Sequence, residues 1–109
     1  MLNAQTATTR LVREMHQTEM SIADTLVSAT ALFNTAAIAN RDHGSVATAG
    51  KAHAALLRLS KMAAGIIEVQ ASAMRAHADL LSIGVETGML DTPGCPDREM
   101  GSARLTAVA

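Results

Sequence analysis

Residues 55–69, ALLRLSKMAAGIIEV, lie at the centre of the segment that decides the fold. Their charged residues are Arg58, Lys61 and Glu68, and at about 100° per residue these three fall in one sector of a helix. Apolar residues therefore occupy well over half of the circumference. Since one neighbouring helix covers only one stripe of such a surface, this helix needs more than one partner.

The wider segment, residues 46–87, carries two apolar seams on different sides of the helix. The first apolar seam comprises Leu57, Ser60, Ala64, Ile67, Ala71, Met74, Ala78, Leu81 and Val85. The second apolar seam comprises Ala55, Leu59, Met62, Ile66, Val69, Ala73, Ala76, Leu80 and Ile83. We expect the first seam to pack within the chain and the second to remain exposed.

A helical pattern also precedes this segment, over residues 6–41. Its apolar residues recur every three or four positions, which is the spacing of a coiled-coil seam. They are Leu11, Met15, Thr18, Ile22, Leu26, Ala29, Phe33 and Ala36. We expect this helix to pack against the first apolar seam, with Thr8, Thr9 or an earlier residue capping its start.

The connection between the two patterns, GSVATAGK at residues 44–51, has some features of a phosphate-binding loop. Such a loop has four residues between its glycines and a Ser or Thr after its lysine, but here five residues separate Gly44 from Gly50, and Ala52 follows Lys51. The segment therefore predicts a turn over residues 42–45. We expect Gly44 to adopt the left-handed cap conformation and Ser45 to cap the next helix.

The composition supports an all-α fold. Hydrophobic residues make up 49% of the 109 residues, but aromatic residues make up only 1%, a single Phe33. The apolar content comes from Ala, Leu, Ile, Val and seven Met, which together suit close helix packing better than a β-sheet.

Together these patterns predict a long antiparallel helical hairpin over residues 1–88, with helices at 6–41 and 46–87. An exposed second seam would form a larger apolar patch than soluble monomers usually tolerate. We therefore predict that two hairpins form a homodimeric four-helix bundle. The predicted interface residues are Leu59, Met62, Ile66, Val69, Leu80 and Ile83. Residues 89–109 contain both prolines and are expected to form a tail or a short helix over 96–106.

Nucleic-acid binding is not expected. The formal net charge is −1, and the nine basic residues are dispersed along the chain rather than collected in a stripe that could neutralise phosphates. A single aromatic residue also leaves no stacking platform for bases.

Catalytic, metal and cofactor sites are not expected either. His16 and Glu19 form the only near match to a helical metal motif, in reversed order and once. His53 and His77 are separated by about 36 Å along one helix at 1.5 Å per residue, so they cannot share an ion. Cys95 lies between Pro and Gly residues of the tail, where we expect a linker thiol; an intermolecular disulfide or a reactive thiol is the alternative.

The sequence predicts a cytoplasmic protein without a transmembrane segment. Its first residues lack the basic and apolar regions of a signal peptide. The longest uncharged run, residues 25–40, is shorter than the roughly 20 apolar residues that a membrane span needs.

The predicted function is that of a non-catalytic, oligomeric scaffold or protein-interaction module. Two alternatives remain open. The wide apolar surface could adsorb to a lipid or polymer inclusion, although the polar face is not rich in Lys or Arg and Phe33 is the single aromatic residue, whereas such helices typically carry both features. Alternatively, another helical protein could cover the exposed seam, as in a chaperone or a subunit of a hetero-oligomer.

Overall fold

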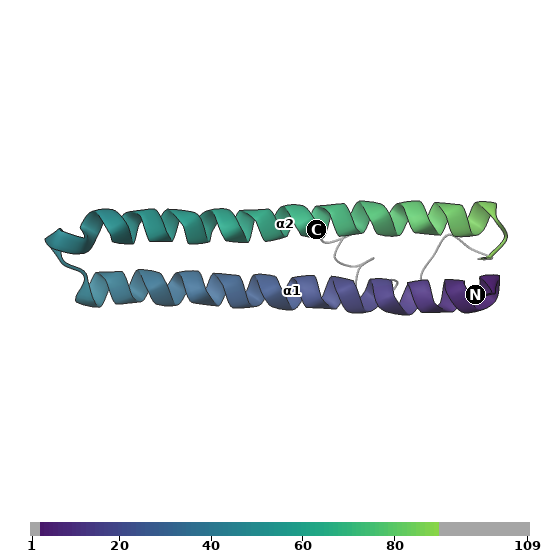
Figure 1. The fold of residues 1–109 in the computed structure, drawn as a ribbon, viewed down its shortest axis with the longest axis horizontal. Coiled ribbons are helices and arrows are strands. Elements are labelled where there is room, and N and C mark those ends of the chain that lie inside the picture. The colour runs from purple at the N-terminus through teal and green to yellow at the C-terminus, as the bar shows by residue number, and fades with distance from the viewer. Residues whose placement is uncertain (1–2, 90–109) are drawn as a thin grey trace, which may run out of the picture. The chain divides into compact units, whose positions relative to one another are not determined.

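A computed structural model of the chain describes residues 3–89. Within them the elements are α1 (Ala4–His43), a short 3-10 helix η1 (Val46–Thr48) and α2 (Ala49–Glu86), which form a helical hairpin without strands (Figure 1). The predicted all-α class and hairpin are therefore confirmed. Cys95 and the alternative helix over 96–106 lie outside the described residues.

Helix α1 begins two residues before the predicted start because Asn3 caps it. The Thr6 N–H donates to Asn3 Oδ1 at 2.7 Å, and the Ala7 N–H donates to the Asn3 carbonyl at 2.9 Å. The prediction allowed for a cap before Thr8 and Thr9, and neither of these threonines is the cap. Both hydroxyls instead donate to carbonyls of the preceding turn, as threonines inside a helix commonly do.

The end of α1 requires a glycine, but not for the predicted reason. Gly44 does not have a positive φ, so the expected left-handed cap is wrong; among the described residues, Gly88 is the glycine with that conformation. The Gly44 N–H instead donates to the Asn40 carbonyl at 2.9 Å, which extends the helical hydrogen-bond pattern. A Cβ atom at position 44 would collide with that carbonyl oxygen and would approach Asn40 Oδ1 to 2.7 Å.

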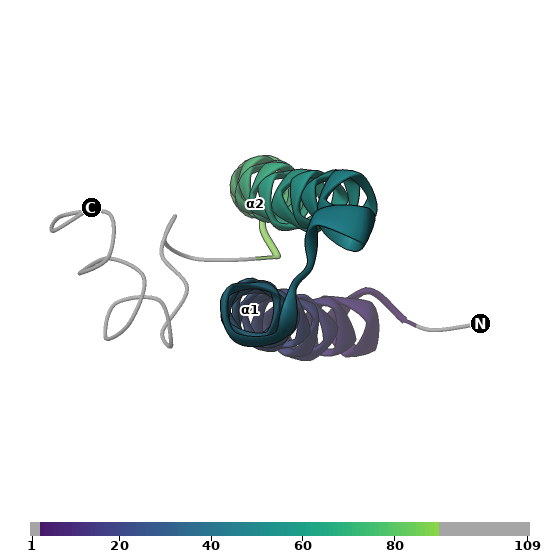
Figure 2. The same cartoon turned by 90° about the vertical axis from the view of Figure 1, so that its left-hand side faces the viewer.

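Ser45 caps the next element, as predicted. Its Oγ accepts a hydrogen bond from the Thr48 N–H at 3.3 Å, and Thr48 Oγ1 accepts one from the Ser45 N–H at 3.4 Å, which completes a capping box. The capped element is η1, and α2 therefore begins at Ala49 instead of residue 46. Figure 2 shows this connection with the turn end of the molecule facing the viewer.

Helix α2 ends at Glu86 in a Schellman motif. The Met89 N–H donates to the Gly84 carbonyl at 2.8 Å, and the Gly88 N–H donates to the Val85 carbonyl at 3.2 Å. Gly88 makes this possible with a φ of 79°, a conformation that L-residues with a side chain rarely adopt. The predicted end of the second helix thus agrees with the structure within one residue.

The chain divides into two compact units. One is Thr18–Ala73, and the described part of the other comprises residues 3–17 and 74–89. In each unit a segment of α1 runs antiparallel beside a segment of α2 (Figure 1, Figure 2).

In the unit Thr18–Ala73, the packed face of α1 agrees largely with the predicted seam. Ala29 is buried, and Ile22, Leu26 and Ala36 are partly buried. Thr18 and Phe33, which the prediction also placed on this face, are exposed.

The packed face of α2 in the same unit differs from the prediction. Leu57 and Ile67 of the first apolar seam are 49% and 53% exposed, so the expectation that this seam packs within the chain is wrong. Most of the partly buried residues instead follow one line, which includes Leu59, Ile66 and Ala73 of the second predicted seam: Ala52, Leu56, Leu59, Ala63, Ile66, Gln70 and Ala73. Because α2 is apolar on both sides of this line, periodicity alone did not determine which side faces α1.

Candidate functional site

The predicted interface residues occupy two different environments. Met62, Val69, Leu80 and Ile83 are 43%, 52%, 37% and 55% exposed. Leu59 and Ile66 are instead partly buried on the packed line of α2. Four of the six predicted residues are therefore available to a partner, and two already contribute to the hairpin.

In the unit Thr18–Ala73, exposed apolar side chains flank the packed line of α2 on both sides. Met62 and Val69 lie on one flank, and Leu57 and Ile67 lie on the other, since the helical rotation separates these pairs across the line through Leu59, Ala63 and Ile66. We call them the Met62 flank and the Leu57 flank. Each flank therefore presents two large, about half-exposed apolar side chains.

Helix α1 also exposes apolar side chains in this unit. Val27 is 68% exposed, Met20 is 52% exposed and Leu32 is 50% exposed. Ala29 is the buried hydrophobic residue among residues 3–89, and no described side chain is fully buried. Within the described residues, the hairpin therefore leaves far more large apolar side chains exposed than it buries.

Small and charged residues occupy specific positions beside the Leu57 flank. Ala64 lies between Leu57 and Ile67 on that side of α2 and is exposed, and Lys61 and Glu68, seven residues apart, are exposed next to it.

An ion pair lies near the end of α1. Asp42 accepts a hydrogen bond from Arg41 Nε at 2.8 Å, which raises the pKa of this guanidinium above its ordinary value.

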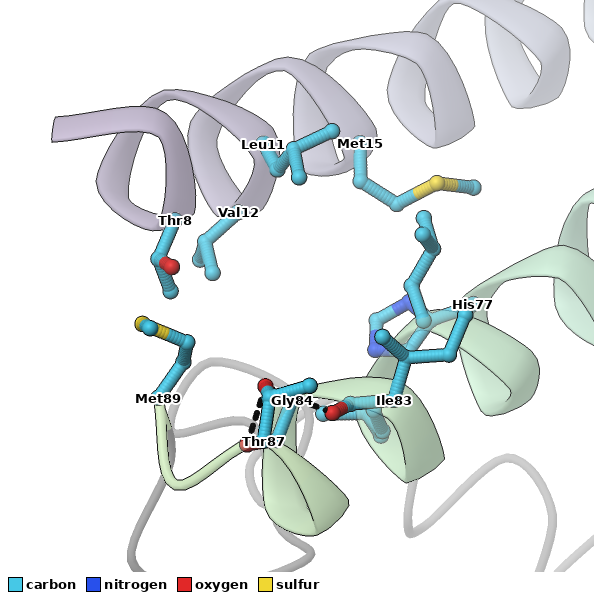
Figure 3. A pocket seen from close by; sticks show the side chains of 11 residues that line it. Thr8, Leu11, Val12, Met15, His77, Ile83, Gly84, Thr87 and Met89 are labelled. Atoms are coloured by element: carbon cyan, nitrogen blue, oxygen red, sulfur yellow. Dashed lines mark hydrogen bonds between the residues drawn. The ribbon is translucent and has the colours of Figure 1, made fainter. Parts of the chain in front are cut away.

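The other unit contains an apolar pocket with a volume of about 210 Å³ (Figure 3). α1 and α2 both contribute to its wall, and Met89 follows the end of α2. The lining residues are Thr8, Leu11, Val12, Met15, His77, Leu80, Leu81, Ile83, Gly84, Thr87 and Met89.

The polar atoms of this pocket are largely engaged. Thr8 Oγ1 donates to the Ala4 carbonyl at 2.9 Å, and Thr87 Oγ1 donates to the Ile83 carbonyl at 2.8 Å, as Figure 3 shows for Thr87. His77 is only 8% exposed. Apart from the His77 ring, the pocket presents mainly methyl, methylene and thioether groups, which favour an apolar occupant.

Sequence reasoning considered His77 only as a possible metal ligand and did not predict that it is buried in the wall of a pocket. The signal was available: His77 continues the spacing of three and four that runs through Ala63, Ile66, Gln70 and Ala73. Sequence reasoning assigned helix packing to the two seams, which are more apolar, and therefore did not place His77 on the packed face. Among residues 3–89, no group of three or more His, Cys, Asp or Glu side chains is arranged to hold a metal ion.

Helix α1 is long and apolar enough, by length and composition, to cross a membrane. It contains an 18-residue window with a mean hydropathy of 1.4, of which 6% is buried in the protein. The shortness of the uncharged run at residues 25–40 therefore does not exclude a membrane role for this helix.

Comparisons with protein-family models, with curated proteins and with solved structures found no match.

Proposed function

We propose that this protein is a non-catalytic helical module that self-associates into a bundle of at least four helices and acts as a scaffold or interaction module. The observation that supports the proposal is the small number of buried hydrophobic side chains among the described residues compared with the large number of exposed ones. Ala29 is the buried hydrophobic residue of the described chain, while large hydrophobic side chains remain exposed along both helices.

The energetics favour association over an isolated hairpin. Complete burial of a Val, Leu, Ile or Met side chain contributes about 1.5–3 kcal/mol, so covering one that is already half buried contributes on the order of 1 kcal/mol. Met62 and Val69 on each of two copies would together add several such contributions. A helical protein can obtain them most simply by pairing with itself.

The Met62 flank is the proposed dimer contact. It contains Met62 and Val69, and the predicted interface continues along α2 with Leu80 and Ile83, which are also exposed. Ile66 is a poor test position because it is partly buried within the hairpin, so a charge there would damage the fold of one chain. Val69, 52% exposed, is the better probe.

The test is the native mass by size-exclusion chromatography with light scattering over a range of concentrations. The wild type is expected to exceed the monomer mass, and Val69→Asp is expected to lower the mass. Val46→Asp is the matched control, because Val46 is 97% exposed in η1 and lies outside both flanks. A wild type with the monomer mass at every concentration would refute self-association and favour a different helical protein as the partner.

A second candidate function is adsorption to a lipid surface or polymer inclusion, which the apolar window of α1 favours. Val27, at 68%, is among the most exposed large apolar side chains of α1. Flotation with neutral phosphatidylcholine vesicles should carry the wild type but not Val27→Asp, while Val46→Asp floats normally. Wild-type protein that stays at the bottom of the gradient would reject this function.

A further inference from the structure

The Leu57 flank has a feature that the Met62 flank lacks, which is a pair of opposite charges that becomes complementary to itself when a second copy runs in the reverse direction. On this side of α2, residues Leu57, Ser60, Ala64, Ile67 and Ala71 follow each other at spacings of three and four. Leu57 and Ile67 are half exposed, and Lys61 and Glu68 are exposed along the edge.

We propose that the Leu57 flank binds the same flank of α2 in a second copy, with the two helices antiparallel. This inference rests on the proposed self-association and adds a second contact to it. Because the Leu57 and Met62 flanks lie on opposite sides of the packed line, a dimer through one leaves the other exposed. Each copy then contacts two others, and the assembly is larger than a dimer.

The spacing of large and small residues fits this pairing. A two-fold axis between Gly65 and Ile66 places Ala64 opposite Ile67 of the second copy, and Ser60 opposite Ala71 of the second copy. The small Ala64 thus meets the larger Ile67, and Ser60 meets Ala71, which is of similar size. Small residues let two helices approach toward the lower end of the usual separation of about 8–10 Å.

The charges select the antiparallel orientation. Lys61 and Glu68 are spaced almost symmetrically about the same axis, so each Lys61 lies beside Glu68 of the second copy, and the pair occurs twice. In a parallel pairing each of these two residues would instead lie beside the opposite edge of the second copy, which carries Leu56, Ala63 and Gln70 and no charge. Exposed charge pairs add little affinity, but at helix edges they determine partner orientation.

The Met62 flank does not have this complementarity. The edge beside Met62 and Val69 carries Arg58, Gly65 and Ser72, which include no carboxylate. Self-recognition by charge is therefore specific to the Leu57 flank.

The decisive experiment compares native masses of charge variants at one concentration by light scattering. The wild type should exceed the dimer mass, and Lys61→Glu and Glu68→Lys should each fall to about the dimer mass. Mixing these two variants in equal amounts should restore the larger mass, because each supplies the charge that the other lacks. Lys51→Glu, the same charge change well before the flank, should leave the mass unchanged.

Ile67→Asp tests the apolar part of the contact and should also give the dimer mass, with helix content checked by circular dichroism. A wild type that is already dimeric, or an Ile67→Asp variant with the wild-type mass, would overturn the second contact. Charge variants that keep the wild-type mass would overturn the antiparallel alignment. A monomeric wild type would instead refute the proposed function itself, so the two failures are distinguishable.

The alignment can also be read directly by cross-linking. Ser60→Cys and Ala71→Cys chains, both carrying Cys95→Ser, should form a mixed disulfide dimer when combined and oxidised. Ser60→Cys combined with Ala55→Cys should not, because Ala55 lies on the other side of α2. Equal cross-linking of both mixtures would contradict the proposed register.

Discussion

The carbonyl oxygen of Asn40 accepts a hydrogen bond from the Gly44 N–H at 2.9 Å and occupies the space where a side chain at position 44 would begin. This close approach ends α1 and directs the chain into the turn. The residue must be glycine because of steric contact with the preceding helical turn, and its own backbone conformation does not require it.

Gly44→Ala should therefore destabilise the hairpin by about 1–3 kcal/mol, because its Cβ must displace the Asn40 carbonyl. Gly50→Ala is the control: nothing lies within 4 Å of a Cβ at that position, and α2 should gain up to about 1 kcal/mol. Urea unfolding followed by circular dichroism at a fixed protein concentration measures both. Equal effects of the two substitutions would show that the contact with Asn40 is unimportant.

Ser45→Ala should cost about 1 kcal/mol, within the range of 0.5–2 kcal/mol for loss of an N-cap. The substitution removes the Ser45 Oγ that accepts from the Thr48 N–H, and leaves this donor only the Ser45 carbonyl at 3.2 Å. Ser28→Ala is a matched change at an exposed position inside α1, where alanine is the better helix former. A cap that contributes nothing would leave Ser45→Ala as stable as Ser28→Ala in the same unfolding experiment.

Gly88→Ala should destabilise the end of α2 by about 1–2 kcal/mol, because a side chain makes the left-handed conformation costly. The φ of 79° is fixed by the two Schellman hydrogen bonds from Met89 and Gly88. Amide hydrogen exchange of these two N–H groups should accelerate in the variant. Unchanged protection at Met89 would indicate that the motif tolerates a side chain at position 88.

The fold was predictable because its determinants are local. The spacing of Ile22, Leu26 and Ala29 defines the packed face of α1, and Ser45 and Gly88 mark element boundaries that depend only on neighbouring residues. The role of Gly44 was not predictable, because its contact with Asn40 depends on the three-dimensional path of the turn.

The candidate site was less predictable for a different reason. Leu56 and Leu57 are chemically identical, and both belong to apolar periodicities, so the sequence cannot specify which of them faces α1. The rotation of α2 depends on the sum of its contacts along the whole face and on where η1 lets the helix begin. For the same reason the sequence did not place His77 in the wall of a pocket.

The rotation of α2 can be tested with these two adjacent leucines. Leu56 is partly buried on the packed line, whereas Leu57 is 49% exposed. Leu56→Ala should lower the free energy of unfolding by about 2–3 kcal/mol, because it removes methylene groups from the contact with α1 and leaves a gap. Leu57→Ala should change it by less than about 0.5 kcal/mol at low concentration, where the chains are dissociated. The measurement is urea unfolding at the lowest protein concentration that circular dichroism allows. A larger loss for Leu57→Ala than for Leu56→Ala would mean that the first apolar seam packs within the chain after all, and that the Leu57 flank is not available to a second copy.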